Sequence, residues 1–223
     1  MPARNAVEQA DPSVRPTVRA AVANLAGGSG RSTLTWLLGV AAAEQGLAAM
    51  ELLPSHDRAR RGPSPYKSSK TYSSADEHHQ SQSAWEGDFV VTDTSSLQDN
   101  ADRQAIADAH VILVPTILHR PRGAVLTIEH FAEDPEMRYM GQPVIPVLFT
   151  PTPEAVGRRG RRLAAKAIAA AVDTFDCASA AVRVYPVHVI ACDTTLTTDR
   201  SWPGLADATR EGAHELLTTC RIQ

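Results

Sequence analysis

The apolar residues of this chain alternate between short continuous runs and longer segments in which they recur every three or four positions. Short runs rich in β-branched residues favour buried strands, whereas the wider spacing favours amphipathic helices. The sequence predicts strands at residues 18–23, 47–53, 89–93, 109–115, 143–149 and 182–189. It predicts helices at residues 34–42, 99–108, 121–131, 154–175 and 202–220. This alternation predicts a single α/β domain, with a mostly parallel twisted sheet and helices on both faces.

Two predicted elements are weaker than the others. The strand at 47–53 follows from its place after the first helix, since its Ala, Met, Glu and Leu favour helix by propensity. The strand at 182–189 contains Pro186, which indicates an edge strand or an early break.

Two polar segments lack the apolar pattern. Residues 1–16 are predicted to form a flexible N-terminal arm, without the apolar stretch of a secretory signal. The remaining residues, 17–223, form the predicted domain, which includes a mobile loop at 55–83 that is rich in serine and proline and poor in aliphatic residues. His78 and His79 are adjacent in this loop, and we interpret them as solvated side chains rather than metal ligands.

The composition indicates a globular protein without a general attraction for anionic partners. The chain has 223 residues, 43% of them hydrophobic, which suffices for one sizeable α/β domain or at most two small ones. Its formal net charge is −3, so contact with nucleic acid or anionic lipid would need a local patch. The three cysteines are scattered, which argues against a disulfide framework or zinc site and favours a reducing cytoplasm. No apolar run reaches the ~18 residues that suggest a membrane span. The last residues, TTCRIQ, have too little apolar character for a membrane-targeting helix, so we expect no membrane contact.

A glycine-rich turn follows the first predicted strand and leads into the first predicted helix. Glycines let backbone N–H groups point into one concavity, and the helix start adds unpaired donors and the positive end of its dipole. This layout predicts a phosphate-binding loop formed by Gly27, Gly28, Ser29, Gly30, Arg31, Ser32 and Thr33. The usual pattern is G-x-x-x-x-G-K-[ST], and here Leu25 and Arg31 stand at the positions of its first glycine and its lysine. A glycine-rich turn that binds no ligand is an equally open interpretation of these residues.

A carboxylate stands at the end of the third predicted strand. The segment FVVTD ends in Asp93, and ligands of parallel sheets gather at the carboxyl ends of the strands. If this strand neighbours the first one, Asp93 faces the glycine loop, where it could hold the water shell of Mg²⁺ while Ser32 supplies a hydroxyl ligand. The alternative is an ordinary strand-end aspartate that caps a turn.

The glycine loop, the FVVTD strand and the AHVILVP strand stand in an order that resembles the ParA/MinD family of deviant-Walker P-loop ATPases. The resemblance runs from Val18 to the last helix, with AGGSGRST matching the family's KGGxGK[ST]T and FVVTDTSS matching a strand that ends in Asp-Thr-Pro-Pro. It implies a P-loop NTPase-like domain that binds ATP and Mg²⁺ at residues 27–33, with Ser32 and Asp93 at the magnesium site. It also implies a homodimer formed around ATP, non-specific DNA binding, and a partition-type partner protein that stimulates hydrolysis.

Three positions depart from the family pattern. The signature lysine that reaches across the dimer is Ala26 here, and the loop lysine is Arg31, whose wider planar head group is not an equivalent of lysine in a tight loop. The family's Asp-x-Asp-Pro run, which positions the attacking water, is replaced by LLPSHD, where Asp57 is a weak substitute at shifted register. These losses weaken the case for catalysis, because charge stabilisation and water positioning are most of what a phosphoryl-transfer enzyme supplies.

The predicted helix at 154–175 carries a basic cluster. It consists of Arg158, Arg159, Arg161, Arg162 and Lys166. Spacings of three and four place several of these residues on one helical face, which could contact DNA phosphates, although a solvated face is the more common role of such a cluster.

Two functions therefore remain open. One is a cytoplasmic partition or positioning protein that binds ATP–Mg²⁺, with weak hydrolysis at most. The other is a non-catalytic binding or assembly module of the same fold that no longer uses nucleotide. Whether the protein is an enzyme stays open at this point.

Overall fold

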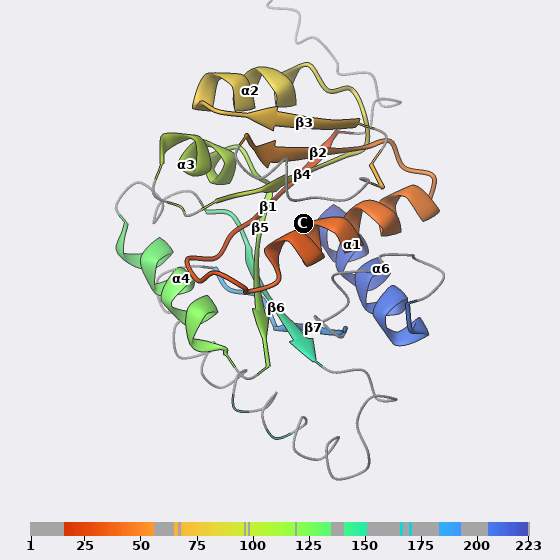
Figure 1. The fold of residues 1–223 in the computed structure, drawn as a ribbon, viewed down its shortest axis with the longest axis vertical. Helices are drawn as coiled ribbons and strands as arrows, with labels where there is room; N and C mark the ends of the chain where they lie inside the picture. Colours follow the sequence, from red (N-terminus) through yellow and green to blue (C-terminus); the bar gives the residue numbers. More distant parts are fainter. Residues whose placement is uncertain are drawn as a thin grey trace, which may run out of the picture.

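The computed structural model describes residues 16–55, 65–66, 68–95, 97, 99–118, 120–134, 141–150, 166, 170, 183–192 and 205–222. These residues build one parallel sheet of seven strands (Figure 1). The strands are β1 (Val18–Val22), β2 (Ala49–Pro54), β3 (Ser68–Tyr72), β4 (Phe89–Asp93), β5 (Val111–Ile117), β6 (Val144–Thr150) and β7 (His188–Ala191). Their order across the sheet is β3-β2-β4-β1-β5-β6-β7, and every pairing is parallel. The predicted parallel α/β sheet is confirmed.

Helices cover both faces of the sheet. The first face carries α1 (Arg31–Glu44) and α6 (Asp207–Ile222), which lie side by side in front of the sheet in Figure 1. The opposite face carries α2 (Ala75–Ser83), α3 (Asn100–Ala107) and α4 (Arg122–Glu133). None of the helices within the described ranges is both long and apolar enough to cross a membrane.

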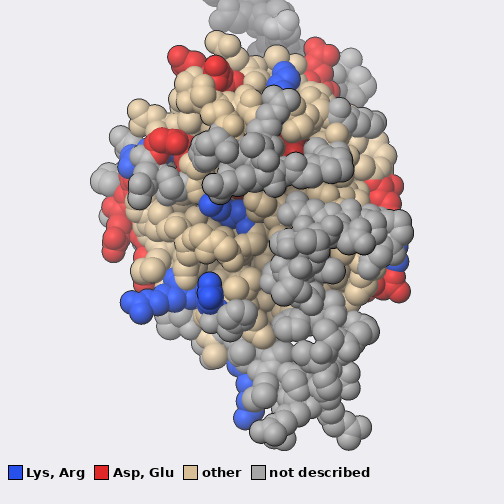
Figure 2. Space-filling model, in the orientation of Figure 1, with Lys and Arg blue, Asp and Glu red and all other residues tan. Residues whose placement is uncertain are grey.

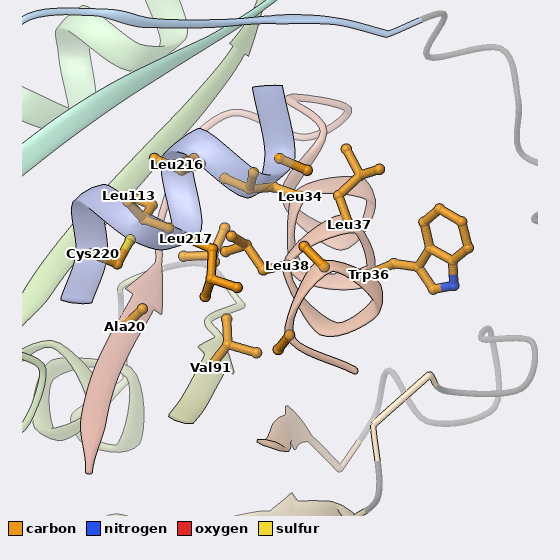
Figure 3. Packing of buried hydrophobic residues seen from close by; sticks show 14 of the residues in the cluster. Ala20, Leu34, Trp36, Leu37, Leu38, Val91, Leu113, Leu216, Leu217 and Cys220 are labelled. Atoms are coloured by element: carbon orange, nitrogen blue, oxygen red, sulfur yellow. The ribbon is translucent and has the colours of Figure 1, made fainter. Parts of the chain in front are cut away.

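The larger core lies between the sheet and the α1/α6 pair. Leu34, Leu37 and Leu38 recur at the spacing that brings them to one side of α1, and all three are fully buried. They belong to one core cluster with Leu216 and Leu217 of α6, and Figure 3 shows Leu34 on the side of α1 that faces α6. Burying each such leucine is worth about 1.5–3 kcal/mol, so this contact fixes where α1 begins and with it the position of the preceding glycine turn.

The central strands are buried on both sides, which explains their nearly continuous apolar sequences. In β5, Leu113 faces the α1/α6 core, whereas Ile112 and Val114 face a second core that α4 closes with Ile128 and Phe131.

The prediction of a mobile loop over 55–83 is wrong for residues 68–83, which form β3 and α2. Polar side chains in this segment find buried partners instead of water. His78, which we expected to be solvated, is fully buried, and its Nε2 lies 3.2 Å from Thr92 Oγ1 of β4. His79 is exposed, and no cluster of three or more metal-ligating side chains occurs among the described residues.

The last strand begins later than predicted. Val184 forms one isolated bridge to Val144, and regular pairing starts at His188 because Pro186 interrupts the ladder. β7 is an edge strand, as its proline indicated. The predicted helix at 154–175 and the start of the predicted helix at 202–220 lie outside the described residues, except that residues 166 and 170 are helical.

Candidate functional site

The glycine loop leaves the carboxyl end of β1 at the centre of the sheet, where β1 lies between β4 and β5. Gly28 and Gly30 have φ angles of 70° and 93°, in the left-handed region that glycine adopts without strain. Gly30 also has no room for a side chain, since a Cβ built on it would lie 2.7 Å from the ring of Phe149 on β6. The turn between β1 and α1 therefore depends on glycine at position 30 for two separate reasons.

A buried asparagine anchors the start of the loop. Asn24 donates from Nδ2 to the carbonyl oxygen of Pro115 at 2.7 Å, and its Oδ1 accepts the backbone N–H of Ala26 at 2.7 Å. The next peptide is held from α4, because the N–H of Leu25 donates to Thr127 Oγ1 at 3.0 Å. These bonds fix the loop against both β5 and α4.

The tip of the loop presents donors that nothing in the described chain uses. No hydrogen bond among the described residues engages the backbone N–H groups of Gly27, Gly28 or Gly30. The hydroxyl of Ser29 is buried and likewise has no partner among the described residues. The first turn of α1 follows directly and has no side-chain cap. Its unpaired backbone N–H groups and the positive end of its dipole therefore add to the donors of the loop. Such an arrangement suits an anion.

The register of the sheet brings Asp93 to the loop. Val22 of β1 pairs with Asp93 of β4, and Ser32 Oγ lies 3.3 Å from Asp93 Oδ2. Asp93 is buried, and its backbone carbonyl oxygen accepts the hydroxyl of Tyr72 at 3.1 Å. A hydroxyl and a carboxylate oxygen at this separation are the ligand types that Mg²⁺ takes in phosphate sites. The predicted proximity of Ser32 and Asp93 is confirmed.

The cation of the loop bonds to the segment after β4. Arg31 donates from Nη1 to the carbonyl oxygen of Thr94 at 2.6 Å. Thr94 is itself tied to the end of β1, since its N–H and its Oγ1 both donate to the carbonyl oxygen of Val22, at 3.1 and 3.0 Å. Arg31 therefore links the start of α1 to the end of β4. Thr33 lies half-buried in the first turn of α1.

Ala26, at the position of the missing signature lysine, packs against α4. A Cβ built on Gly123 of α4 would lie 2.7 Å from the Cβ of Ala26, so the two residues are in direct backbone-to-methyl contact. In this chain, position 26 contributes packing to the loop instead of a positive charge.

Sequence reasoning missed the carboxylate that shapes the segment after Asp93. Asp102 of α3 is fully buried and accepts hydrogen bonds from Ser95 Oγ at 2.7 Å, the N–H of Leu97 at 2.8 Å and the hydroxyl of Tyr72 at 3.2 Å. It holds Leu97 in the left-handed region, with a φ of 62°, which costs a non-glycine residue about 1–2 kcal/mol. Burial, together with the nearby carboxylates, raises the pKa of Tyr72 far above its usual value. The only signal in the sequence is the spacing of Asp99 and Asp102, with Asp99 capping α3 through the N–H of Asp102.

The other predicted site residues are largely outside the described ranges. Asp57 and four of the basic residues, Arg158, Arg159, Arg161 and Arg162, lie there. Lys166 is described as helical and exposed. On the face shown in Figure 2, the described Lys and Arg side chains stand in small separate groups, with Asp and Glu nearer the margins. The described part of this face therefore offers no continuous basic surface for a nucleic acid.

Solved structures share this fold along nearly the whole chain. A plasmid partition protein from Borrelia burgdorferi matches with a TM-score of 0.55 and 12% identity, over 92% of this chain and 99% of its own. The pNOB8 ParA bound to nonspecific DNA matches with a TM-score of 0.58 and 11% identity, over 93% and 99%. The septum site-determining protein MinD from Pyrococcus horikoshii OT3, complexed with Mg-ADP, matches with a TM-score of 0.54 and 12% identity, over 92% and 95%.

At these identities the likeness establishes the fold, which is that of the ParA and MinD proteins. No protein-family model matches the sequence, and no curated protein sequence does.

Proposed function

We propose that this chain, which has the fold of the ParA and MinD proteins, is a partition or positioning protein that binds ATP and Mg²⁺ at residues 27–33. The observation that carries the proposal is the 3.3 Å approach of Ser32 Oγ to Asp93 Oδ2, directly beneath a loop with unused N–H donors. The fold neighbours support it, since MinD was solved with Mg-ADP and ParA with DNA.

The residues present fit such a ligand. The N–H groups of the glycine turn and the buried hydroxyl of Ser29 would contact phosphate oxygens, and an anion there would give Ser29 the partner it lacks within the described chain. Ser32 and Asp93 would hold Mg²⁺ directly and through its water shell. When bound, Mg²⁺ neutralises charge on the phosphates.

Hydrolysis is proposed to be weak. Ala26 supplies no charge, and the hydrogen bond from Arg31 Nη1 to the carbonyl oxygen of Thr94 directs one edge of the guanidinium group towards the segment after β4. Asp57 stays a weak proposal for positioning water. A site that hydrolyses ATP slowly or not at all could still alter the conformation of the segment after Asp93 when nucleotide binds.

The further properties are proposed by analogy with the fold neighbours. They are a homodimer, a partition-type partner protein, a cytoplasmic location, and non-specific DNA contact through the basic residues at 158–166. DNA contact through these arginines should weaken steeply as salt rises, because it would rest on phosphate charge.

A second candidate function is a binding or assembly module that no longer uses nucleotide. Two observations favour it: the engagement of Arg31 by Thr94 and the packing of Ala26 on Gly123. At positions 26 and 31, where related loops carry lysines, this chain has a packing contact and a hydrogen bond to the backbone.

Thermal unfolding with ATP, in the presence and absence of Mg²⁺, distinguishes the two functions. A ligand at 100 times its dissociation constant stabilises the native state by about 2.7 kcal/mol, which raises Tm by roughly 5–10 °C for a chain of this size. We expect the increase to need Mg²⁺, to fall strongly in Ser32→Ala and to persist in Ser83→Ala, a matched change on the exposed side of α2. An unchanged Tm at millimolar ATP–Mg²⁺ would favour the module instead.

A further inference from the structure

A cavity of about 750 Å³ opens at the amino-terminal ends of the strands, opposite the carboxyl ends where the glycine loop lies. Its walls come from the starts of β1, β5 and β6 and from the end of α6. All strands are parallel, so their beginnings share one edge, and the glycine loop follows the other end of β1. The five residues of β1 separate the two places by about 16 Å. The cavity is therefore distinct from the proposed nucleotide site.

Three arginines line this cavity: Arg19, Arg183 and Arg221. None of them forms an ion pair within the described part of the chain. The Nε of Arg19 is buried and has no hydrogen-bond partner there. The guanidinium carbon of Arg183 is held 5.0 Å from the ring centroid of Tyr185, which limits its motion. A buried donor without a partner destabilises the free protein, and a bound anion would remove that cost.

The one carboxylate in the cavity lining is engaged elsewhere. Asp108 accepts a hydrogen bond from Gln104 Nε2 at 2.8 Å through Oδ1, and its Oδ2 lies 3.4 Å from His79 Nδ1 and 3.7 Å from His78 Nδ1. Its charge is thus directed towards α2 and α3, and the guanidinium groups dominate the cavity.

An imidazole adds a neutral donor. His110 Nδ1 accepts the backbone N–H of Arg19 at 3.1 Å, so the proton of the neutral ring is on Nε2. The backbone N–H of His110 donates to the carbonyl oxygen of Arg19 at 2.8 Å, which fixes the two residues together. Burial and the charge of Arg19 lower the pKa of His110, so the ring is neutral in the free protein near pH 7.

We propose that this cavity binds a small multivalent oxyanion, of the phosphate-ester or polycarboxylate class. Arginine forks match both groups with paired, charge-assisted hydrogen bonds. The volume lies in the range of small-molecule sites, roughly 300–1,000 Å³. The site is independent of the glycine loop, so its ligand could be bound whether or not nucleotide is.

The test follows the side-chain ¹⁵N signals of His110 in the full-length protein while inorganic pyrophosphate or citrate is added. We expect saturable shifts and a rise in the pKa of His110, because an anion between the arginines stabilises the protonated ring. The double variant Arg183→Gln/Arg221→Gln should bind about tenfold more weakly or worse, since two charge-assisted contacts are lost. Arg120→Gln, which removes one positive charge at an exposed position outside the cavity, should bind as the parent does.

The two probes separate the ligand sources. Binding of pyrophosphate but not citrate assigns a ligand with phosphate groups, whereas binding of both assigns multivalent oxyanions in general, and either result supports the site. Pyrophosphate that shifts signals of residues 27–33 but leaves His110 unchanged would overturn it, as would unchanged affinity in a folded double variant. Loss of ATP binding in Ser32→Ala without loss of the His110 response would keep this site while testing the nucleotide site separately.

Discussion

Gly30 lies so close to Phe149 that a Cβ on the glycine would stand 2.7 Å from the aromatic ring. This contact joins the glycine turn after β1 to β6, two strands away in the sheet. The turn thus contacts the Phe149 ring of β6, is tied to β5 through Asn24, and packs on α4 through Thr127 and Gly123. Such a loop keeps one shape without a ligand, which reduces the entropy that ligand binding would otherwise cost.

Replacing Gly30 with alanine should destabilise the protein by about 2–4 kcal/mol. The left-handed φ of 93° costs a residue with a Cβ about 1–2 kcal/mol, and displacement of the Phe149 ring adds about 1–2 kcal/mol. Chemical denaturation measures the change. Gly27→Ala is the matched control, since no atom lies within 4 Å of a Cβ there, and its stability should change by less than about 0.5 kcal/mol. Equal losses in the two variants would contradict this account of the turn.

The contact between Ala26 and Gly123 gives a second prediction, with a sign opposite to simple helix propensity. Gly123→Ala in α4 should by propensity add about 1 kcal/mol of stability, but its Cβ would lie 2.7 Å from that of Ala26. The overlap costs about 1–3 kcal/mol, so we expect a net loss of up to about 2 kcal/mol and weaker ligand binding at the loop.

The double variant Ala26→Gly/Gly123→Ala removes the overlap and should recover most of the lost stability. A double-mutant cycle measures the coupling directly. Additive effects of the two single changes would show that position 26 does not pack on α4.

The parts of the site that follow from neighbouring residues in the sequence could be predicted. The parts that depend on side chains from other helices and strands could not. Gly28 and Gly30 carry the turn through their own conformational freedom, and Asp93 reaches Ser32 because strand ends of a parallel sheet share an edge. His78 and Asp102 were not recognised, since their burial depends on Thr92 and Tyr72. A polar segment looks like a loop in the sequence when the groups that satisfy its polar atoms lie on other elements.

Asp102→Asn should destabilise the protein by about 2–4 kcal/mol. The buried carboxylate accepts bonds from Ser95, Leu97 and Tyr72, and the amide group of asparagine would oppose these donors with donors of its own. The loop after Asp93 should loosen, so hydrogen exchange at Ser95 and Leu97 should accelerate. Asp99→Asn is the matched control, because Asn caps a helix as well as Asp does and position 99 is exposed. Similar stabilities of the two variants would argue against a clamping role for Asp102.

The buried imidazole of His78 predicts a loss of stability in mild acid. Burial lowers its pKa from 6.5 to about 4, despite the opposing charges of Asp108 and Asp102, with His79 and Arg19 acting in the same direction as burial. Between these values the unfolded chain binds a proton that the native state does not, so stability rises with pH over this window and is fully present above pH 6.5.

The contribution of His78 is about 3 kcal/mol, lost progressively as the pH falls from 6.5 to 4. Denaturation series at several pH values should therefore show a steeper decline for the parent than for His78→Gln, which keeps a polar side chain but has no ionisable ring. His79→Gln, at the exposed neighbouring position, should retain the parental slope. If His78→Gln also retained that slope, proton uptake on unfolding would belong to other groups, and the buried contact with Thr92 would not control the acid response.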